Sequence, residues 1–142
     1  MKGNKSDLTR RRFVKTGLGA GLYVAAAGYG VSASGCAPDR PVRIGFVGVG
    51  GRGMGMLKVA LALEGVEITA VCDIVEEKVL RAQRLVEAAG QPKPRGFTGP
   101  VDYQKLAELD NLDAVYTATP IDLHTPVMLA ALRAGKYGGT EM

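Results

Sequence analysis

The sequence predicts an α/β protein with a doubly wound parallel sheet in the strand order 3-2-1-4-5. From residue 42 onward, short apolar runs typical of strands alternate with longer segments in which apolar residues recur at helical spacing. The connections between these segments are short, which implies right-handed crossovers and helices on both faces of the sheet. The chain of 142 residues is long enough for one such domain with its own core.

Each element has its own signal. Residues 42–47 form an apolar run that suits a strand covered on both faces. The clearest helix covers residues 75–89, because its apolar residues recur at spacings of four and three and Gly90 follows them. Thr125 and Pro126 predict an N-cap and a first-turn proline for the last helix, which Gly135 closes. The other expected elements are strands at 66–72, near Phe97, at 112–118 and at 137–140, and helices at 53–63 and 102–109.

The first strand runs directly into a glycine-rich turn of the form G-x-G-x-x-G. The turn precedes a predicted helix, and an acid ends the next strand, so the motif stands in the context of a Rossmann-type dinucleotide-binding fold. The first glycine allows the tight turn, the second lets the backbone approach a pyrophosphate, and the third permits close packing of helix and strand. We expect the helix N-terminus to face the phosphates. The turn consists of Gly48, Val49, Gly50, Gly51, Arg52 and Gly53.

Asp73 lies twenty residues after Gly53, at the end of the second strand. Its carboxylate is expected to accept hydrogen bonds from the adenosine ribose and to repel a 2′-phosphate, which favours NAD over NADP. Arg52 has two open roles, a phosphate contact or a solvent-exposed position. The alternative for the whole motif is a glycine turn without a ligand and with a solvated Asp73.

The positive charge of the chain is concentrated at its N-terminus. Residues 1–15 hold six Lys/Arg and one Asp, whereas residues 36–142 hold twelve Lys/Arg and thirteen Asp/Glu. A nucleic-acid-binding protein needs cations spread over a folded face. This charge distribution therefore argues against a nucleic-acid partner and indicates a targeting signal or a membrane anchor.

The stretch TRRRFVK (residues 9–15) precedes 19 uncharged residues, the layout of an export signal. It resembles the twin-arginine signal, with Arg10 and Arg11 as the pair, and implies the twin-arginine export machinery as a partner. We expect residues 1–35 to be this signal. A membrane-spanning anchor is the alternative, since about 20 residues span a bilayer. Contact with a membrane is otherwise expected only through a lipid.

Ser34-Gly35-Cys36 resembles the site at which a bacterial lipoprotein is cleaved and lipidated, with Cys36 as the first mature residue. Plain cleavage after Ala33 is the competing interpretation. The predicted organisation is then a signal at 1–35, a linker at 36–41 and a dinucleotide-binding domain at 42–142. The expected location is the periplasm or cell envelope.

Residues 42–142 resemble the N-terminal domain of the Gfo/Idh/MocA family, which includes glucose–fructose oxidoreductase and inositol dehydrogenase. The stretches that carry the resemblance are VRIGFVGVGGRG, the strand ending VCD, LDAVYTATPIDLHTPVMLAALRAGK and Glu141. It implies that Thr119 and Pro120 line an NAD pocket and that Glu141 belongs to the same site. It also places His124 beside the nicotinamide, although a hydrogen bond at the helix start is an equal alternative for this residue.

In that family a catalytic lysine follows the glutamate, and here Met142 holds its position. No metal is implied, and the catalytic residues stay unknown. The resemblance also implies a C-terminal α/β substrate domain outside residues 1–142 and a homo-oligomer at full length. We therefore expect this chain alone to be inactive.

A narrower similarity leaves the activity open. The stretch RAQRLVEAAGQPKPRGFTGPVDYQKLAELDNLDAVYTATP and the ending GGTE are similar to glycoside hydrolase family 109, which uses NAD to cleave glycosidic bonds through transient oxidation at the sugar C3. The favoured function is an exported oxidoreductase that transfers hydride between NAD and a sugar or cyclitol. The alternatives are such a glycosidase and a non-catalytic envelope module that binds NAD or a sugar.

Overall fold

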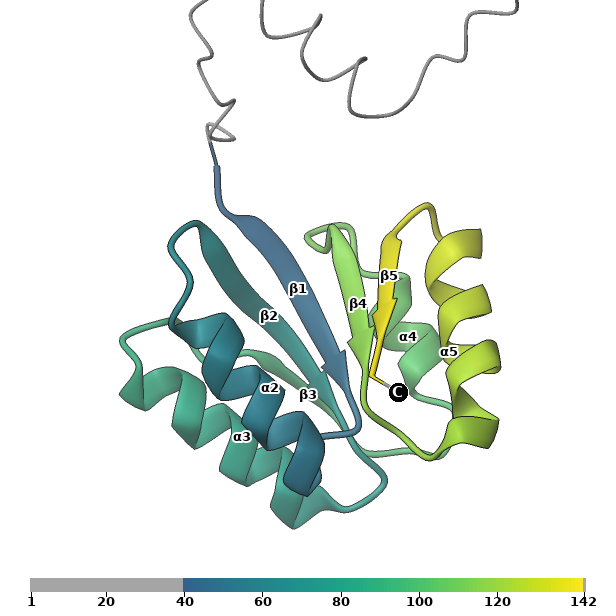
Figure 1. Ribbon diagram of the computed structural model, residues 1–142, viewed down its shortest axis with the longest axis horizontal. Helices are drawn as coiled ribbons and strands as arrows, with labels where there is room; N and C mark the ends of the chain where they lie inside the picture. Colours follow the sequence, from purple (N-terminus) through teal and green to yellow (C-terminus); the bar gives the residue numbers. More distant parts are fainter. Residues whose placement is uncertain (1–39, 142) are drawn as a thin grey trace, which may run out of the picture. The chain divides into compact units, whose positions relative to one another are not determined.

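The computed structural model describes residues 40–141. Five parallel strands form one sheet in the order β3-β2-β1-β4-β5, which confirms the predicted fold class. The strands are β1 (Val42–Val47), β2 (Val66–Cys72), β3 (Arg95–Phe97), β4 (Ala114–Thr117) and β5 (Tyr137–Thr140). The helices are α2 (Gly51–Leu61), α3 (Glu76–Ala88), α4 (Tyr103–Ala107) and α5 (Ile121–Arg133) (Figure 1).

The helices cover both faces of the sheet, and each face has its own hydrophobic core. On one face α2 and α3 pack on the first strands through residues such as Leu57, Ile68 and Val86, all nearly inaccessible to solvent. On the other face α4 and α5 contribute Leu106 and Val127 to a second cluster. Figure 1 shows α2 and α3 side by side over β1–β3, with α5 beside β5. Because the sheet is buried on both faces, the buried parts of its central strands, residues 45–47 of β1 and 68–72 of β2, contain no charged residue.

Two helices begin earlier than the sequence predicts. Helix α2 begins at Gly51 instead of residue 53, so the end of the glycine motif forms its first turn. Helix α5 begins at Ile121, with Pro120 as its N-cap, and Pro126 lies inside it. The prediction of Thr125 as the N-cap was therefore wrong. Pro126 is the sixth residue of α5, so the helix lacks the hydrogen bond that a backbone N–H at this position would donate to the Asp122 carbonyl.

At the edge where the strands begin, Asp113 joins the start of the folded body to the sheet. Arg40 donates both terminal nitrogens to this carboxylate, at 2.7 and 3.0 Å, and Arg43 donates through its backbone and its guanidinium. Hydrogen bonds from these arginines hold the pKa of Asp113 well below its usual range. The chain is thereby fixed at the N-terminal edge of the sheet two residues before β1 starts.

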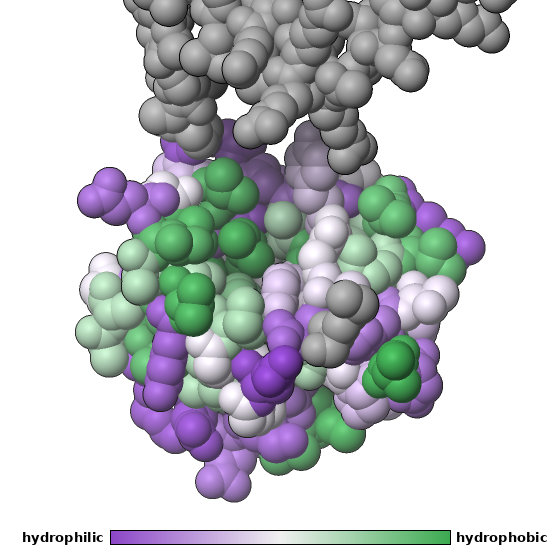
Figure 2. All heavy atoms as spheres, in the orientation of Figure 1, coloured by the Kyte–Doolittle hydropathy of each residue, from purple (hydrophilic) through white to green (hydrophobic). Residues whose placement is uncertain are grey.

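The expected export signal, the linker up to residue 39 and Met142 lie outside the described residues, so what was expected of them remains a prediction. Among residues 40–141, none of the helices combines the length and the apolar character that crossing a membrane needs. Exposed apolar side chains there include Val59 and Leu63. Figure 2 shows that hydrophobic residues gather on one side of this face, where α2 ends, while the rest is mixed.

Candidate cofactor site

The glycine turn between β1 and α2 has a shape that only glycine permits at two positions. Gly48 has φ of +82°, and a Cβ there would lie 2.9 Å from the carbonyl of Ala118. A Cβ on Gly53 would lie 1.9 Å from the carbonyl oxygen of Gly48. The Gly48 amide donates to the Cys72 carbonyl at 2.8 Å, which fixes the turn against the end of β2. The turn is therefore close-packed on its inner side.

The outer side of the same turn presents backbone donors to open space. The first backbone bond of α2 runs from the Met54 amide to the Gly50 carbonyl, so the amides of the three preceding residues come before the helical ladder. A Cβ on Gly51 would meet nothing within 4 Å, and the first turn of α2 contains no acid. Unpaired amides and the positive end of the helix dipole make this a site for a pyrophosphate.

Asp73 is buried at the end of β2, with 8% of its surface exposed. One carboxylate oxygen accepts the Val49 amide and the other accepts the Val75 amide, each at 3.0 Å. The solvated Asp73 that the sequence left open is therefore excluded. Each carboxylate oxygen can accept two hydrogen bonds, so capacity remains for the hydroxyls of a ribose.

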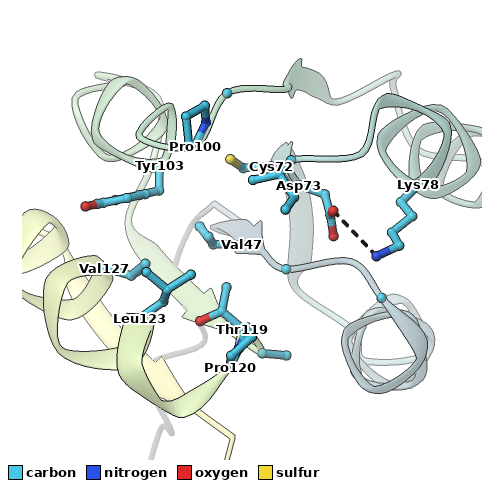
Figure 3. Close-up of a pocket in the computed structure, with 15 residues that line it drawn as sticks. Val47, Cys72, Asp73, Lys78, Pro100, Tyr103, Thr119, Pro120, Leu123 and Val127 are labelled. Carbon is cyan, nitrogen blue, oxygen red and sulfur yellow. Dashed lines mark ion pairs between the residues drawn. The ribbon is translucent and has the colours of Figure 1, made fainter.

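A cavity of about 270 Å³ opens between Asp73 and the loop after β4. Figure 3 shows Asp73 on one side and Thr119 with Pro120 on the other, while Tyr103 and Leu123 lie across the opening. Its walls come from the ends of three strands and from α4 and α5. An apolar cleft with a few polar groups at the carboxyl ends of parallel strands is the usual ligand site of this fold class.

Cys72 lines this cavity as an apolar group. The thiol is 3% exposed, and its burial raises the pKa to about 12. The sulfur therefore stays protonated at neutral pH, without the thiolate that nucleophilic or metal chemistry needs. Among residues 40–141, no group of His, Cys, Asp and Glu is arranged to hold a metal ion.

A second cavity of about 280 Å³ lies on the other side of the β4–α5 loop and gathers the remaining predicted residues. Arg52, Thr119, His124 and Glu141 line it together. The Arg52 side chain is 69% exposed, in line with the solvent-exposed position expected as one of its two roles, and its Nε donates to Glu141 at 2.6 Å. The Tyr116 hydroxyl donates to the other oxygen of Glu141 at 2.7 Å.

These contacts shift the pKa values of Glu141, which lines the second cavity, and of its hydrogen-bond partner Tyr116. The hydrogen bond from Tyr116, followed by that from Arg52, lowers the pKa of Glu141. Burial, together with the bond to Glu141, raises the pKa of Tyr116 to about 12. A glutamate anion and a neutral tyrosine are therefore the stable forms near pH 7.

His124 makes two hydrogen bonds within the protein. Its Nε2 lies 2.8 Å from the Thr119 carbonyl oxygen, which can only accept, so Nε2 carries a proton. Its Nδ1 lies 2.9 Å from the Thr140 hydroxyl. The ring thus joins the start of α5 to the preceding loop and to the end of β5. Of the two predicted roles, the structure shows the hydrogen bond at the helix start.

Several residues of the site had no signal in the sequence. Tyr103 and Pro100 reach the first cavity from the segment after β3, and Tyr116 reaches Glu141 from within β4. Lys78 lies on α3 and pairs with Asp73 at 3.8 Å. Its spacing of five residues after the acid, about one helical turn into α3, is the one hint that a sequence reader could have used.

The close inner packing of the turn, its outward amides and the anchored Asp73 fit a dinucleotide, and they define this body as a Rossmann-type nucleotide-binding domain. The sequence profile of the Gfo/Idh/MocA oxidoreductase family, described as an NAD-binding Rossmann fold, matches residues 42–138. The chain therefore belongs to this family, as its NAD-binding domain.

Several curated relatives are named glycosyl hydrolase family 109 proteins. A glycosyl hydrolase family 109 protein of Saccharopolyspora erythraea is 38% identical over 161 residues, which cover 99% of this chain and 35% of the relative. An alpha-N-acetylgalactosaminidase of Bacteroides fragilis is 39% identical over 101 residues, which cover 71% of this chain and 24% of the relative. The chain thus spans about a third or less of the length of these relatives.

Solved structures share the fold. Apo scyllo-inositol dehydrogenase from Lactobacillus casei superposes with a TM-score of 0.62 at 23% identity, covering 72% of this chain and 28% of that one. A 3-ketoreductase from Actinomadura kijaniata in complex with NADP has a TM-score of 0.58 at 29% identity, covering 71% and 30%. The first likeness supports the fold alone.

Proposed function

We propose that the full-length protein is an NAD-dependent enzyme that transfers hydride at a carbon of a sugar or cyclitol, and that this chain supplies its cofactor half. One observation carries the proposal. The glycine turn, the N-terminus of α2 and the anchored Asp73 meet around an apolar cavity at one edge of the sheet. The name of one curated relative, alpha-N-acetylgalactosaminidase, supports a sugar as the substrate.

The geometry suggests a position for each part of the dinucleotide. Asp73 in the first cavity would hold the adenosine ribose, and the amides at the start of α2 would hold the pyrophosphate. Thr119 and Glu141, which line the second cavity, would hold the nicotinamide half. NAD supplies the hydride acceptor when bound. The residues of this chain bind it, orient it and exclude water from its adenosine half.

The curated relatives favour one outcome within this proposal, which is cleavage of a glycosidic bond with NAD regenerated in each turnover. Relatives named glycosyl hydrolase family 109 match nearly the whole chain at 38% and 37% identity. A net oxidoreductase remains the second candidate, because the family model is that of an oxidoreductase family and a solved structure at 29% identity is a 3-ketoreductase.

The two outcomes differ in what accumulates. Full-length protein is incubated with p-nitrophenyl α-N-acetylgalactosaminide and, separately, with free sugars and cyclitols plus NAD. A glycosidase releases nitrophenol without a matching rise in NADH, whereas an oxidoreductase produces one NADH for each sugar oxidised. Dinucleotide binding without either product, over a broad panel, would contradict the proposed enzyme and leave a binding module.

The location is part of the same proposal. The twin-arginine pattern at residues 10–11 supports export to the periplasm or envelope. The twin-arginine route suits a protein that must fold around a cytoplasmic cofactor before it crosses the membrane. Cys36 is the proposed attachment point of a lipid.

A further inference from the structure

Lys78 places an ammonium group between the phosphate-binding turn and the ribose-binding acid. Its Nζ lies 3.8 Å from the Asp73 Oδ1 and 4.0 Å from the point where a Cβ on Gly50 would stand. Figure 3 shows the lysine reaching from its helix toward the carboxylate. The lysine side chain is 46% exposed and the Asp73 side chain 7%, so the ammonium lies on the solvent side of the pair.

The charge of Asp73 is already compensated before a ligand arrives. Each of its oxygens accepts one backbone amide, and the formal charge of Lys78 cancels its own. An uncompensated carboxylate at this position repels a second anion, which is the reason for expecting NAD alone. A carboxylate held by two amides and paired with a mobile lysine does not oppose a 2′-phosphate in the same way.

The other cation near the turn is engaged elsewhere. Arg52 forms an ion pair with Glu141 on the side of the second cavity. Of the described residues that line the first cavity, Lys78 is the one cation. Any phosphate attached to the adenosine ribose therefore meets this ammonium, whose long side chain can turn from the carboxylate to the phosphate.

We propose that this site accepts NADP(H) as well as NAD(H), and that Lys78 determines the acceptance by binding the 2′-phosphate. The adenosine ribose keeps its contact with Asp73, and Lys78 moves from Asp73 to the phosphate. The inference rests on the dinucleotide site and holds whichever reaction the full-length protein performs.

The test is a binding measurement on full-length protein freed of dinucleotide. NADH and NADPH are titrated calorimetrically into the wild type and into Lys78→Gln, Lys78→Arg and Arg81→Gln. Arg81 is the matched control, because it is an exposed cation on the same helix and does not line the cavity. We expect the wild type to bind NADPH within about tenfold of NADH, as one charge-assisted hydrogen bond offsets the cost of a second anion.

Lys78→Gln should weaken NADPH by at least about tenfold and NADH by much less, while Lys78→Arg restores NADPH binding. Arg81→Gln should change neither affinity. A wild type that binds NADPH more than about a hundredfold weaker than NADH overturns the proposal. So does a Lys78→Gln variant that weakens both dinucleotides equally or neither. Dinucleotide binding without turnover would count against the proposed reaction and leave this inference standing.

Discussion

Arg52 and Glu141 connect the first turn of the phosphate-binding helix to the end of the edge strand β5. The Arg52 Nε donates to Glu141 at 2.6 Å across 89 positions of sequence, and Tyr116 donates to the same carboxylate from β4. The glutamate therefore couples the glycine turn to the two strands on the far side of β1.

The Tyr116 hydroxyl is the largest cause of the lowered pKa of Glu141, so its removal should raise that pKa. We expect Tyr116→Phe to move the titration of the Glu141 carboxylate toward its ordinary value of about 4.3. A carbon-detected NMR titration of the side chain measures this. Tyr137→Phe is the control, because Tyr137 is 81% exposed on β5. An unchanged Glu141 titration in Tyr116→Phe would contradict the assigned hydrogen bond.

Two glycines on α2 should respond to alanine in opposite directions. Gly53→Ala forces a Cβ against the Gly48 carbonyl and should lower the free energy of unfolding by about 3 kcal/mol. Gly55→Ala, two residues on and open on its outer side, should raise it by about 1 kcal/mol, because alanine favours the helix. Urea denaturation of both variants checks the pair. Equal effects at the two positions would show that the turn is not close-packed.

Asp113 should make the stability of the protein depend on pH in the acid range. Asp113→Asn removes the charge that Arg40 and Arg43 contact, and we expect a loss of about 2 kcal/mol in the free energy of unfolding at pH 7. The pKa of Asp113 is lowered on folding, so its contribution is complete above the unfolded value of about 4. That contribution is lost as the pH falls toward the folded pKa.

The measurement for Asp113 is thermal unfolding of the wild type and the variant between neutral and strongly acid pH. The two curves should converge as the solution becomes acid. Asp110→Asn is the control, since Asp110 is an exposed acid three residues earlier. If the difference in stability between the wild type and Asp113→Asn stays constant across this pH range, the shape of the Asp113 side chain and not its charge stabilises the protein.

The arginine pair near the N-terminus should be required for export. The double substitution Arg10→Lys with Arg11→Lys keeps the charge and should hold the protein in the cytoplasm, because the twin-arginine machinery recognises the pair itself. Arg12→Lys changes the variable position of the motif and should leave export intact. Cell fractionation followed by immunoblotting gives the answer. Normal export of the double variant would remove the basis for assigning the twin-arginine route.

The central strands were predictable because the sheet is covered on both faces there. Residues 42–47 and 66–72 were expected as strands and are β1 and β2. Residues 137–140 were also expected as a strand and form β5, although three of its four residues are exposed. The start of α5 was harder to predict. Thr125 and Pro126 are local sequence signals, whereas the position at which the helix begins depends on its packing against the rest of the fold. Leu123 faces the first cavity from the first turn of α5, and that contact comes from the packing of the fold.

The residues of the candidate site also divide into those that could be predicted from the sequence and those that could not. The glycine turn and Asp73 could be predicted, since their spacing along the chain reflects the geometry of one strand–turn–helix unit. Tyr103 and Tyr116 could not, because each reaches the site through the packing of a separate element. The pairing of Arg52 with Glu141 was hidden for the same reason, although both residues had been singled out. For Lys78 the spacing from Asp73 was the one available signal.

The clamp formed by Arg40 and Asp113 determines at which edge of the sheet the chain enters the folded body. It holds the incoming chain at the edge where the strands begin, whereas the dinucleotide site lies at the edge where they end, about 20 Å away along a six-residue strand. For a protein anchored through Cys36, as proposed above, the attachment would enter the folded body at Arg40, on the opposite edge of the sheet from the proposed dinucleotide site.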